Sequence, residues 1–247
     1  MIISTPGLHN LRLLVLPILA AACGTAPVAE GPDASTVVDT PTIAATLQLT
    51  GKTIMASVGR IQEFTPVEVS VFRNGAQVPL ATTVSASDAS FEITLTTDGT
   101  AIDGYVLARY RDFVDTYFYP PAPIDHDVAD LAVLTVTEAL YYVAEGAAVG
   151  VTLEPSRGWG LLKVVDAANR PIAGAVVSST PPGIVRYNGS DRRPSETATV
   201  TNDDGVAYAM NLPVGDVVFT ATHGSQSFSS RPVFVRAGAV TTTMLVP

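Results

Sequence analysis

The feature that most constrains this chain is a series of strand-like segments separated by turn residues at 170–221. Within it, residues 206–212 read VAYAMNL, so larger apolar side chains alternate with small or polar ones. That period of two is typical of a strand with one face buried. The pair DG at 204–205 favours the positive backbone angles of a tight hairpin, and PVG at 213–215 marks a second turn. The segment therefore predicts antiparallel β-structure.

The composition also favours an all-β fold. Of the 247 residues, 47% are hydrophobic and only 15% are charged, while 19 glycines and 18 prolines supply turns. Abundant valine and threonine favour strands. The net charge of −9 repels phosphate backbones, so we expect no nucleic-acid partner.

Three short motifs in the same stretch resemble those of the carboxypeptidase regulatory-like domain. They read PIAGAV at 171–176, TNDDG at 201–205 and NLPVG at 211–215. The resemblance covers roughly residues 158–247 and implies a transthyretin-like (prealbumin-like) antiparallel sandwich. In metallocarboxypeptidases this domain is an accessory beside the zinc enzyme, so the resemblance implies no catalytic residue here.

Residues 46–137 repeat the pattern more loosely. TPVEVSV at 65–71 stands where residues 171–177 stand later, and FEITL at 91–95 alternates as a half-buried strand should. We therefore predict an all-β chain of two tandem transthyretin-like antiparallel β-sandwiches, at residues 46–137 and 158–247.

The period of the sequence changes between the two predicted sandwiches, at residues 132–148. Thr135 followed by Glu138 fits a helix capping box, so we predict one short helix, with residues 138–157 forming helix and linker. Trp159, the only tryptophan, is expected to seal the seam between the sandwiches rather than to bind a ligand.

The N-terminus has the pattern of an export signal. The apolar run at 13–22 is far shorter than the ~20 residues that span a bilayer, so residues 1–22 predict a secretion signal rather than a membrane helix. Small residues before Cys23 resemble a bacterial lipoprotein lipobox, although Ala20 replaces the usual leucine. Cys23 is the only cysteine and has no internal disulfide partner, which lipid attachment would explain. The alternative is ordinary cleavage that leaves a free thiol.

The segment after Cys23 is predicted to be a tether. Residues 23–45 hold three prolines and no aromatic residue, a composition too poor in apolar surface to order itself. The resemblance to bacterial lipoproteins implies the outer membrane, because Gly24 rather than Asp follows the cysteine. We expect an exported protein held in the bacterial envelope by acylated Cys23, with the lipid bilayer as one partner. Periplasmic and surface-facing orientations both remain open.

Catalytic motifs are missing from the sequence. It contains no Gly-x-Ser-x-Gly, His-Glu-x-x-His, phosphate loop or Cys-x-x-Cys, so we expect no enzyme and no cofactor. Asp125, His126 and Asp127 are weak candidates for a metal, but a solvated loop is the interpretation we favour. Lys163 resembles the lysine of isopeptide-forming pilin and adhesin domains, yet residues 240–247 hold neither Asn nor Asp to complete such a crosslink.

Two surfaces are candidates for ligand contact. The first is the aromatic-rich stretch that includes Tyr117 and Tyr119, because aromatic rings stack on sugars and anchor interfaces. The second is a predicted loop at 179–195, which is long for a hairpin connection. The alternatives are core packing for the first and a tolerated surface insertion for the second. The candidate contacts in the predicted loop are Arg186, Tyr187, Arg192 and Arg193.

Taken together, these features predict a non-catalytic cell-envelope lipoprotein that acts as a binding or scaffolding module for a protein or glycan. The alternative is an accessory subunit that modulates a separate envelope hydrolase, either a peptidase or a carbohydrate-active enzyme. A hydrolase that co-purifies from membranes would distinguish the two.

Overall fold

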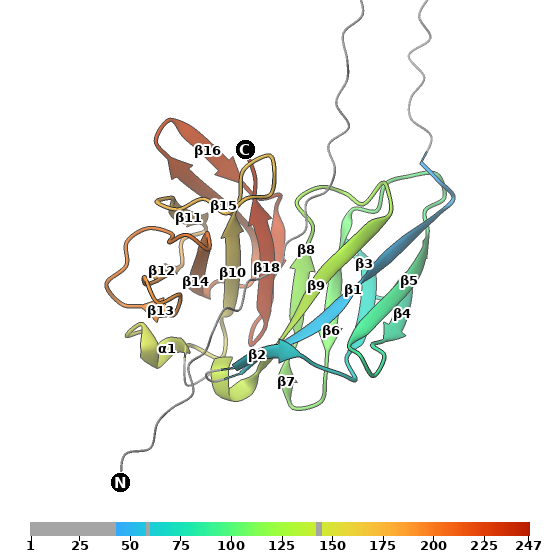
Figure 1. Ribbon diagram of the computed structural model, residues 1–247, viewed down its shortest axis with the longest axis horizontal. Coiled ribbons are helices and arrows are strands. Elements are labelled where there is room, and N and C mark those ends of the chain that lie inside the picture. The colour runs from blue at the N-terminus through green and yellow to red at the C-terminus, as the bar shows by residue number, and fades with distance from the viewer. Residues whose placement is uncertain (1–42, 58–59, 142–144) are drawn as a thin grey trace, which may run out of the picture.

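The computed structural model describes residues 43–57, 60–141 and 145–247, and these are mainly β-strand (Figure 1). The predicted all-β class is therefore confirmed. The predicted signal at 1–22, Cys23 and the tether up to residue 42 lie outside the described residues. In the part of the chain that is described, no helix is long and apolar enough to span a bilayer.

The strands fall into a first half (residues 46–137) and a second half (residues 158–247). Those of the first half are β1 (Thr46–Ser57), β2 (Arg60–Glu63), β3 (Glu68–Arg73), β4 (Ala81–Val84), β5 (Ser90–Thr96), β6 (Gly104–Arg109), β7 (Phe113–Val114), β8 (Thr116–Tyr119) and β9 (Val128–Thr137). The helical turn α1 (Glu145–Ala148) precedes the second half. The second half contains β10 (Gly158–Val164), β11 (Val176–Thr180), β12 (Ile184–Asn188), β13 (Pro194–Ser195), β14 (Val206–Leu212), β15 (Gly215–His223), β16 (Gln226–Ser229), β17 (Val233–Val235) and β18 (Val240–Leu245).

One nine-stranded sheet runs through both halves of the described chain. Its order is β13-β12-β14-β10-β18-β8-β6-β3-β4. The C-terminal strand β18 lies between β10 and β8 and is parallel to both, with Val240 opposite Trp159 on one side and Thr116 on the other. The two sandwiches predicted from the sequence were separate units joined by a linker, so this shared sheet is a feature that the repeat pattern does not reveal.

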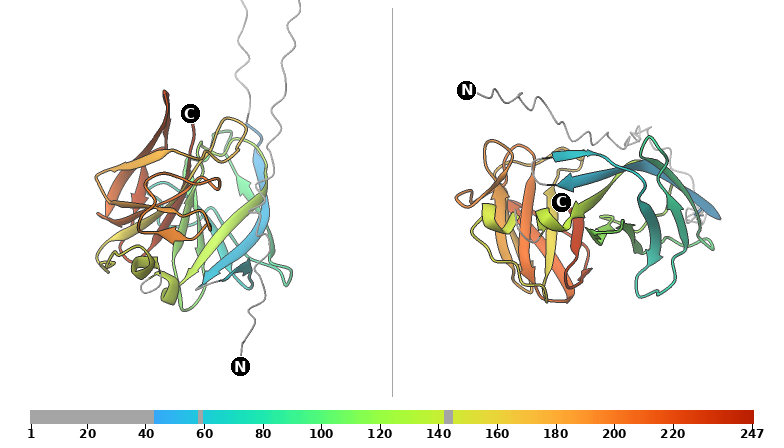
Figure 2. Two further views of the ribbon diagram at one scale, coloured as in Figure 1. Left: turned by 60° about the vertical axis from the view of Figure 1, so that its left-hand side comes forward. Right: turned by 90° about the horizontal axis from the view of Figure 1, so that it is seen from below.

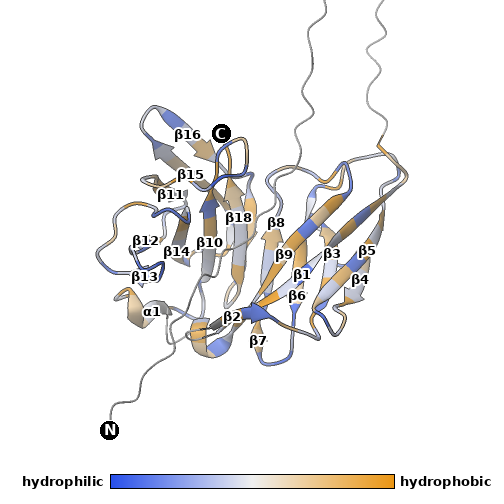
Figure 3. Ribbon diagram, in the orientation of Figure 1, coloured by the Kyte–Doolittle hydropathy of each residue, from blue (hydrophilic) through white to orange (hydrophobic). Residues whose placement is uncertain are grey.

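A smaller sheet covers each half of the long sheet, on opposite faces (Figure 2). The sheet that contains β5, β1 and β9 packs on the first half, and β11, β15, β16 and β17 pack on the second half. Strand β6 shows directly that the two smaller sheets lie on opposite faces of the long sheet. Its Val106 and Ala108 enter the core of the first half, while Tyr105 and Leu107 enter the core of the second half. Successive residues of a strand point to opposite faces, so the two covers lie on different sides. Apolar positions accordingly recur along the strands of both halves (Figure 3).

A third apolar cluster lies at the junction of the halves. Strand β14, predicted to be half-buried, is buried on both faces, because Ala207 and Ala209 enter the second core while Tyr208 and Met210 enter the junction. Trp159 is 2% exposed and lies in this cluster, where the sequence analysis expects it. The other buried members are Ala56, Val114, Val136, Leu140, Tyr141, Val149, Val151 and Val240.

The predicted capping box is wrong. Thr135 lies within β9, and its Oγ1 donates a hydrogen bond to the carbonyl of Ile54 at 3.1 Å. Pairing of β9 with β1 thus overrides the local helix signal. Helical structure begins only at residues 138–141, where the amide of Leu140 donates to Oγ1 of Thr137 at 3.4 Å.

A tight turn ends at Gly205, but Asp204 lacks the predicted positive φ and the predicted hairpin around the turn is wrong. Gly205 has a φ of 69°, and its amide donates to the carbonyl of Asn202 at 3.0 Å. Residues 198–202 form no strand. Instead, the amide of Thr201 donates to the carbonyl of Ala175 at 2.9 Å, and the amide of Gly174 donates back to the carbonyl of Thr201 at 2.7 Å.

Candidate functional site

The aromatic stretch lies on the face of the long sheet that meets the second half. Tyr117 and Tyr119 in β8 are 8% and 2% exposed. Tyr105 of β6 lies between them, with ring centroids 5.5 Å from Tyr117 and 5.3 Å from Tyr119. Phe72 of β3 stacks on Tyr105 at 5.2 Å. The structure therefore gathers these rings into a ladder across three neighbouring strands.

Arg236 of the second half closes over this ladder. Its guanidinium carbon lies 4.0 Å from the ring centre of Tyr117 and 4.7 Å from that of Tyr105. Its Nη1 donates to the hydroxyl of Tyr119 at 3.1 Å and to the carbonyl of Phe234 at 3.0 Å. Cation–π contacts and charged hydrogen bonds both strengthen where water is excluded. Arg236 thus ties the halves together, and a ligand would have to displace it to reach the rings.

The electrostatics of the two tyrosines follow from this packing. Burial raises the pKa of Tyr117 and of Tyr119, and the nearby Arg236 cation opposes the rise in both. Both hydroxyls therefore stay neutral near pH 7 and serve as hydrogen-bonding groups. A salt bridge between Arg231 and Asp103 forms another contact between the halves.

The predicted loop at 179–195 is largely strand. Residues 184–188 form β12, which pairs with β14 and extends the long sheet by one strand. Tyr187 is 5% exposed, and its hydroxyl accepts from the amide of Val177 at 2.8 Å. Nε of Arg186 donates to the carbonyl of Val149 at 3.1 Å. These two candidate contacts are thus used within the fold, because the segment is an added strand and not a free loop.

The remaining arginines lie at the turn after β12. Arg192 donates from Nε and Nη2 to the two carboxylate oxygens of Asp203, at 3.1 and 2.5 Å. That pairing lowers the pKa of Asp203. The Arg193 side chain is exposed, and within the described residues it makes no hydrogen bond or ion pair. Strands β12 and β8 lie four strand spacings apart, ~19 Å, so the two candidate surfaces do not form one site.

The weak metal candidates are not brought into a ligand set. Nδ1 of His126 lies 2.5 Å from a carboxylate oxygen of Asp125, while Asp127 accepts a hydrogen bond from the amide of Gln48 at 2.8 Å. Across the described residues, no three His, Cys, Asp or Glu side chains are placed to hold a metal ion. All three candidates are exposed in the loop that leads into β9.

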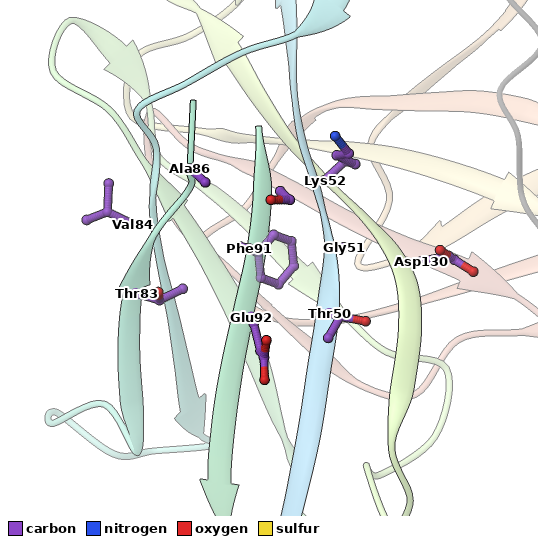
Figure 4. Close-up of a pocket in the computed structure, with 10 residues that line it drawn as sticks. Thr50, Gly51, Lys52, Thr83, Val84, Ala86, Phe91, Glu92 and Asp130 are labelled. Carbon is purple, nitrogen blue, oxygen red and sulfur yellow. The ribbon is translucent and has the colours of Figure 1, made fainter. Parts of the chain in front are cut away.

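A shallow groove of roughly 550 Å³ crosses β5, β1 and the end of β4 (Figure 4). Its cation is Lys52, whose Nζ donates to the carbonyl of Asp88 at 2.5 Å and lies 3.5 Å from Glu63. Phe91 is 5% exposed and turned into the core, so the groove offers no aromatic face. The groove is therefore a polar surface depression whose charge is already paired.

Lys163 lies in β10, directly opposite Met244 of the last strand. Burial lowers the pKa of its amine, and the charge of Asp204 partly opposes the shift. The last strand is thus beside Lys163, as an isopeptide bond would require, but it presents methionine rather than Asn or Asp.

Comparison with known proteins assigns no family. No family model matches the chain, and no curated protein matches it. Among solved structures, it is similar to the shaft pilin SpaA from Lactobacillus rhamnosus GG, at 9% identity and a TM-score of 0.25, over 82% of this chain and 98% of the pilin. It is also similar to GBS52, the minor pilin of Streptococcus agalactiae, at 12% identity and a TM-score of 0.26, over 81% of this chain and 95% of that one. At these identities and scores the pilins assign no function here.

Arg231 and Arg236, which join the two halves, are not singled out by the sequence analysis. The segment RPVFVR at 231–236 alternates buried Val233 and Val235 with Phe234 and Arg236 on the other side. That alternation is a strand signal with an aromatic residue and a cation on one face. It marks a contact surface, although it does not identify the opposite half as the partner.

Proposed function

We propose that this protein is a non-catalytic, exported envelope lipoprotein that serves as a rigid scaffold for a protein or glycan partner. The observation that carries the proposal is the single sheet shared by both halves, reinforced by Arg236 and Arg231. Such a body holds its surface loops at fixed separations. The groove across β5, β1 and β4 is a shallow surface depression.

The mechanism of such a scaffold is passive. Acylation of Cys23 supplies the anchor, and several acyl chains on one residue hold firmly where one chain alone is marginal. The segment before β1 acts as a spacer. The two sandwich-like halves then present their loops to a partner at a constant geometry, which lowers the ordering cost of binding. The tandem transthyretin-like relationship of the halves and their outer-membrane location are parts of the same proposal.

Metabolic labelling tests this function at its first step. Full-length protein is expressed in a bacterium that processes lipoproteins and is fed an alkyne analogue of palmitate. We expect label on the wild-type chain in the membrane fraction, and neither label nor membrane retention for Cys23→Ser. Equal membrane retention of the two proteins, or an unlabelled wild-type chain, would contradict the proposal.

A further inference from the structure

Three segments meet at one end of the first half, which we call the loop end: residues 43–45, 74–80 and 97–103. Thr97 donates from Oγ1 to the carbonyl of Ala44 at 2.5 Å and from its amide to the carbonyl of Ala45 at 3.0 Å. Arg73 donates to the carbonyls of Thr97 and Ala101 at 3.3 and 3.1 Å. The chain therefore enters β1 directly beside the loop that connects β3 to β4.

That connecting loop has an apolar tip. Val78 is 75% exposed, the highest value among the exposed large hydrophobic residues of the described chain, and Leu80 is 38% exposed. Residues 74–80 read NGAQVPL and carry no charge. The amide of Leu80 donates to the carbonyl of Val71 at 2.7 Å, and that of Ala76 donates to the carbonyl of Arg73 at 3.1 Å. Both ends of the loop are thus held while its apolar tip faces solvent.

A second apolar turn lies at the same end. The amide and carbonyl of Ile102 exchange hydrogen bonds of 2.8 and 3.0 Å with those of Ile124. This pairing places the turn PPAP at 120–123 beside residues 97–103, with Ala122 and Pro123 exposed. The loop end therefore combines two uncharged turns with the point where the N-terminal segment enters.

We propose that the loop end docks on the bilayer that holds Cys23, with Val78 and Leu80 entering the interfacial layer. This inference rests on the proposed lipid anchor. Between Cys23 and Ile43 the chain spans at most ~70 Å, so an anchored molecule keeps its loop end close to the membrane. Linkage to an anchor makes the second contact intramolecular, so two apolar side chains suffice where they would not bind alone.

The charges around the loop end select the kind of lipid. Asp98, Asp103, Asp125 and Asp127 lie on or beside its loops, whereas Arg73 and Arg231 are the nearby cations and Arg231 is already paired with Asp103. This excess of carboxylates is repelled by anionic headgroups, and salt screens the repulsion. Docking is therefore stronger on zwitterionic vesicles, and on anionic vesicles it increases with ionic strength.

A fluorescent label at the loop tip tests the docking. The full chain, acylated at Cys23, carries Val78→Cys as its free thiol and is labelled with an environment-sensitive dye. It is then reconstituted in phosphatidylcholine vesicles that contain nitroxide-labelled lipid. The matched control is Val214→Cys, because Val214 is 51% exposed and follows β14, which runs opposite to β3 in the long sheet. Val214 therefore lies at the other end of the molecule.

We expect a blue shift and nitroxide quenching at position 78, and neither at position 214. Equal, unshifted emission at both positions, with palmitate present on Cys23, would overturn the docking while leaving the anchor intact. A chain without palmitate would overturn the proposed function as well. A shift at position 78 that grows with protein density in the vesicles, without nitroxide quenching, would identify a second copy as the occupant and would refute the bilayer contact.

Discussion

The most informative single substitution is in the strand that joins the two halves. Thr241 in β18 is completely buried between Gly160 of β10 and Tyr117 of β8. Its Oγ1 has no hydrogen-bond partner among the described residues. Thr243, two residues on and facing the same side, is 4% exposed, but its Oγ1 donates to the carbonyl of Tyr119 at 2.9 Å. The chain thus offers a variant and a matched control on one strand.

The expected effects of the two substitutions have opposite signs. An unsatisfied buried hydroxyl costs ~1–3 kcal/mol, so Thr241→Val, which replaces it by a methyl group of similar size, should raise the free energy of unfolding by ~1–2 kcal/mol. For a chain of this length that corresponds to a rise in Tm of ~3–6 °C. Thr243→Val removes a satisfied hydrogen bond and should lower the free energy of unfolding by ~1 kcal/mol.

Urea unfolding followed by the fluorescence of Trp159 measures both variants. Trp159 is the only tryptophan, is 2% exposed and lies opposite Val240 of β18, so its fluorescence reports the loss of the contact between β10 and β18. A Thr241→Val protein that is less stable than wild type would refute the placement of β18 at the centre of the sheet. The same conclusion would follow if Thr243→Val were the more stable of the pair.

Three further substitutions test other parts of the structure. Lys163→Met should be more stable than wild type at pH 7, because burial holds the pKa of Lys163 in the folded protein below its ordinary 10.5. The free energy of unfolding of the wild type therefore rises with pH up to 10.5. The difference between the two proteins, measured by urea unfolding, should close near pH 10.5. Gly205→Ala should cost more than ~1 kcal/mol in thermal unfolding, because φ is 69° and a Cβ would lie 2.6 Å from the carbonyl oxygen of Val164; an unchanged Tm would contradict the turn. Arg236→Met should lower the free energy of unfolding by ~2 kcal/mol through lost cation–π and hydrogen-bond contacts. Arg193→Met should change it by less than ~0.5 kcal/mol. Equal effects would argue against the role of Arg236 in holding the two halves together.

The sequence predicts the local elements well where one face of a strand is buried and the turn residues agree. The alternation of Phe91, Ile93 and Leu95 with polar residues in β5 appears in the structure as predicted. The tight turn at Gly205 does too. Both signals are local, since they depend only on the pleat of a strand and on which residues tolerate a positive φ.

The errors arise where distant strands meet. Thr135 and Glu138 carry a valid helix signal, but pairing of β9 with β1 decides the outcome. Residues 184–188 lie within the stretch predicted as a loop, yet they pair with β14 and bury Tyr187. A repeat pattern describes each sandwich by itself, so it contains no information on which edge strands join.

In the candidate sites, too, the local features are predicted from the sequence and the contacts between distant segments are not. The aromatic-rich stretch does form a cluster, but Arg236, more than a hundred residues later, determines that the cluster faces the other half. Arg192 is paired with Asp203 because the turn after β12 folds back on the turn before β14. Neither pairing is evident from spacing along the chain.

The most direct test of the shared sheet is the distance across it. In a Cys23→Ser background, spin labels are attached at Val84→Cys in β4 and Ile184→Cys in β12, which are exposed and lie in the two halves. Seven strand spacings separate these strands, so pulsed electron–electron double resonance should give one narrow distance distribution centred near ~35 Å. A broad or two-peaked distribution, as expected for two sandwiches that move independently about a linker, would contradict the account.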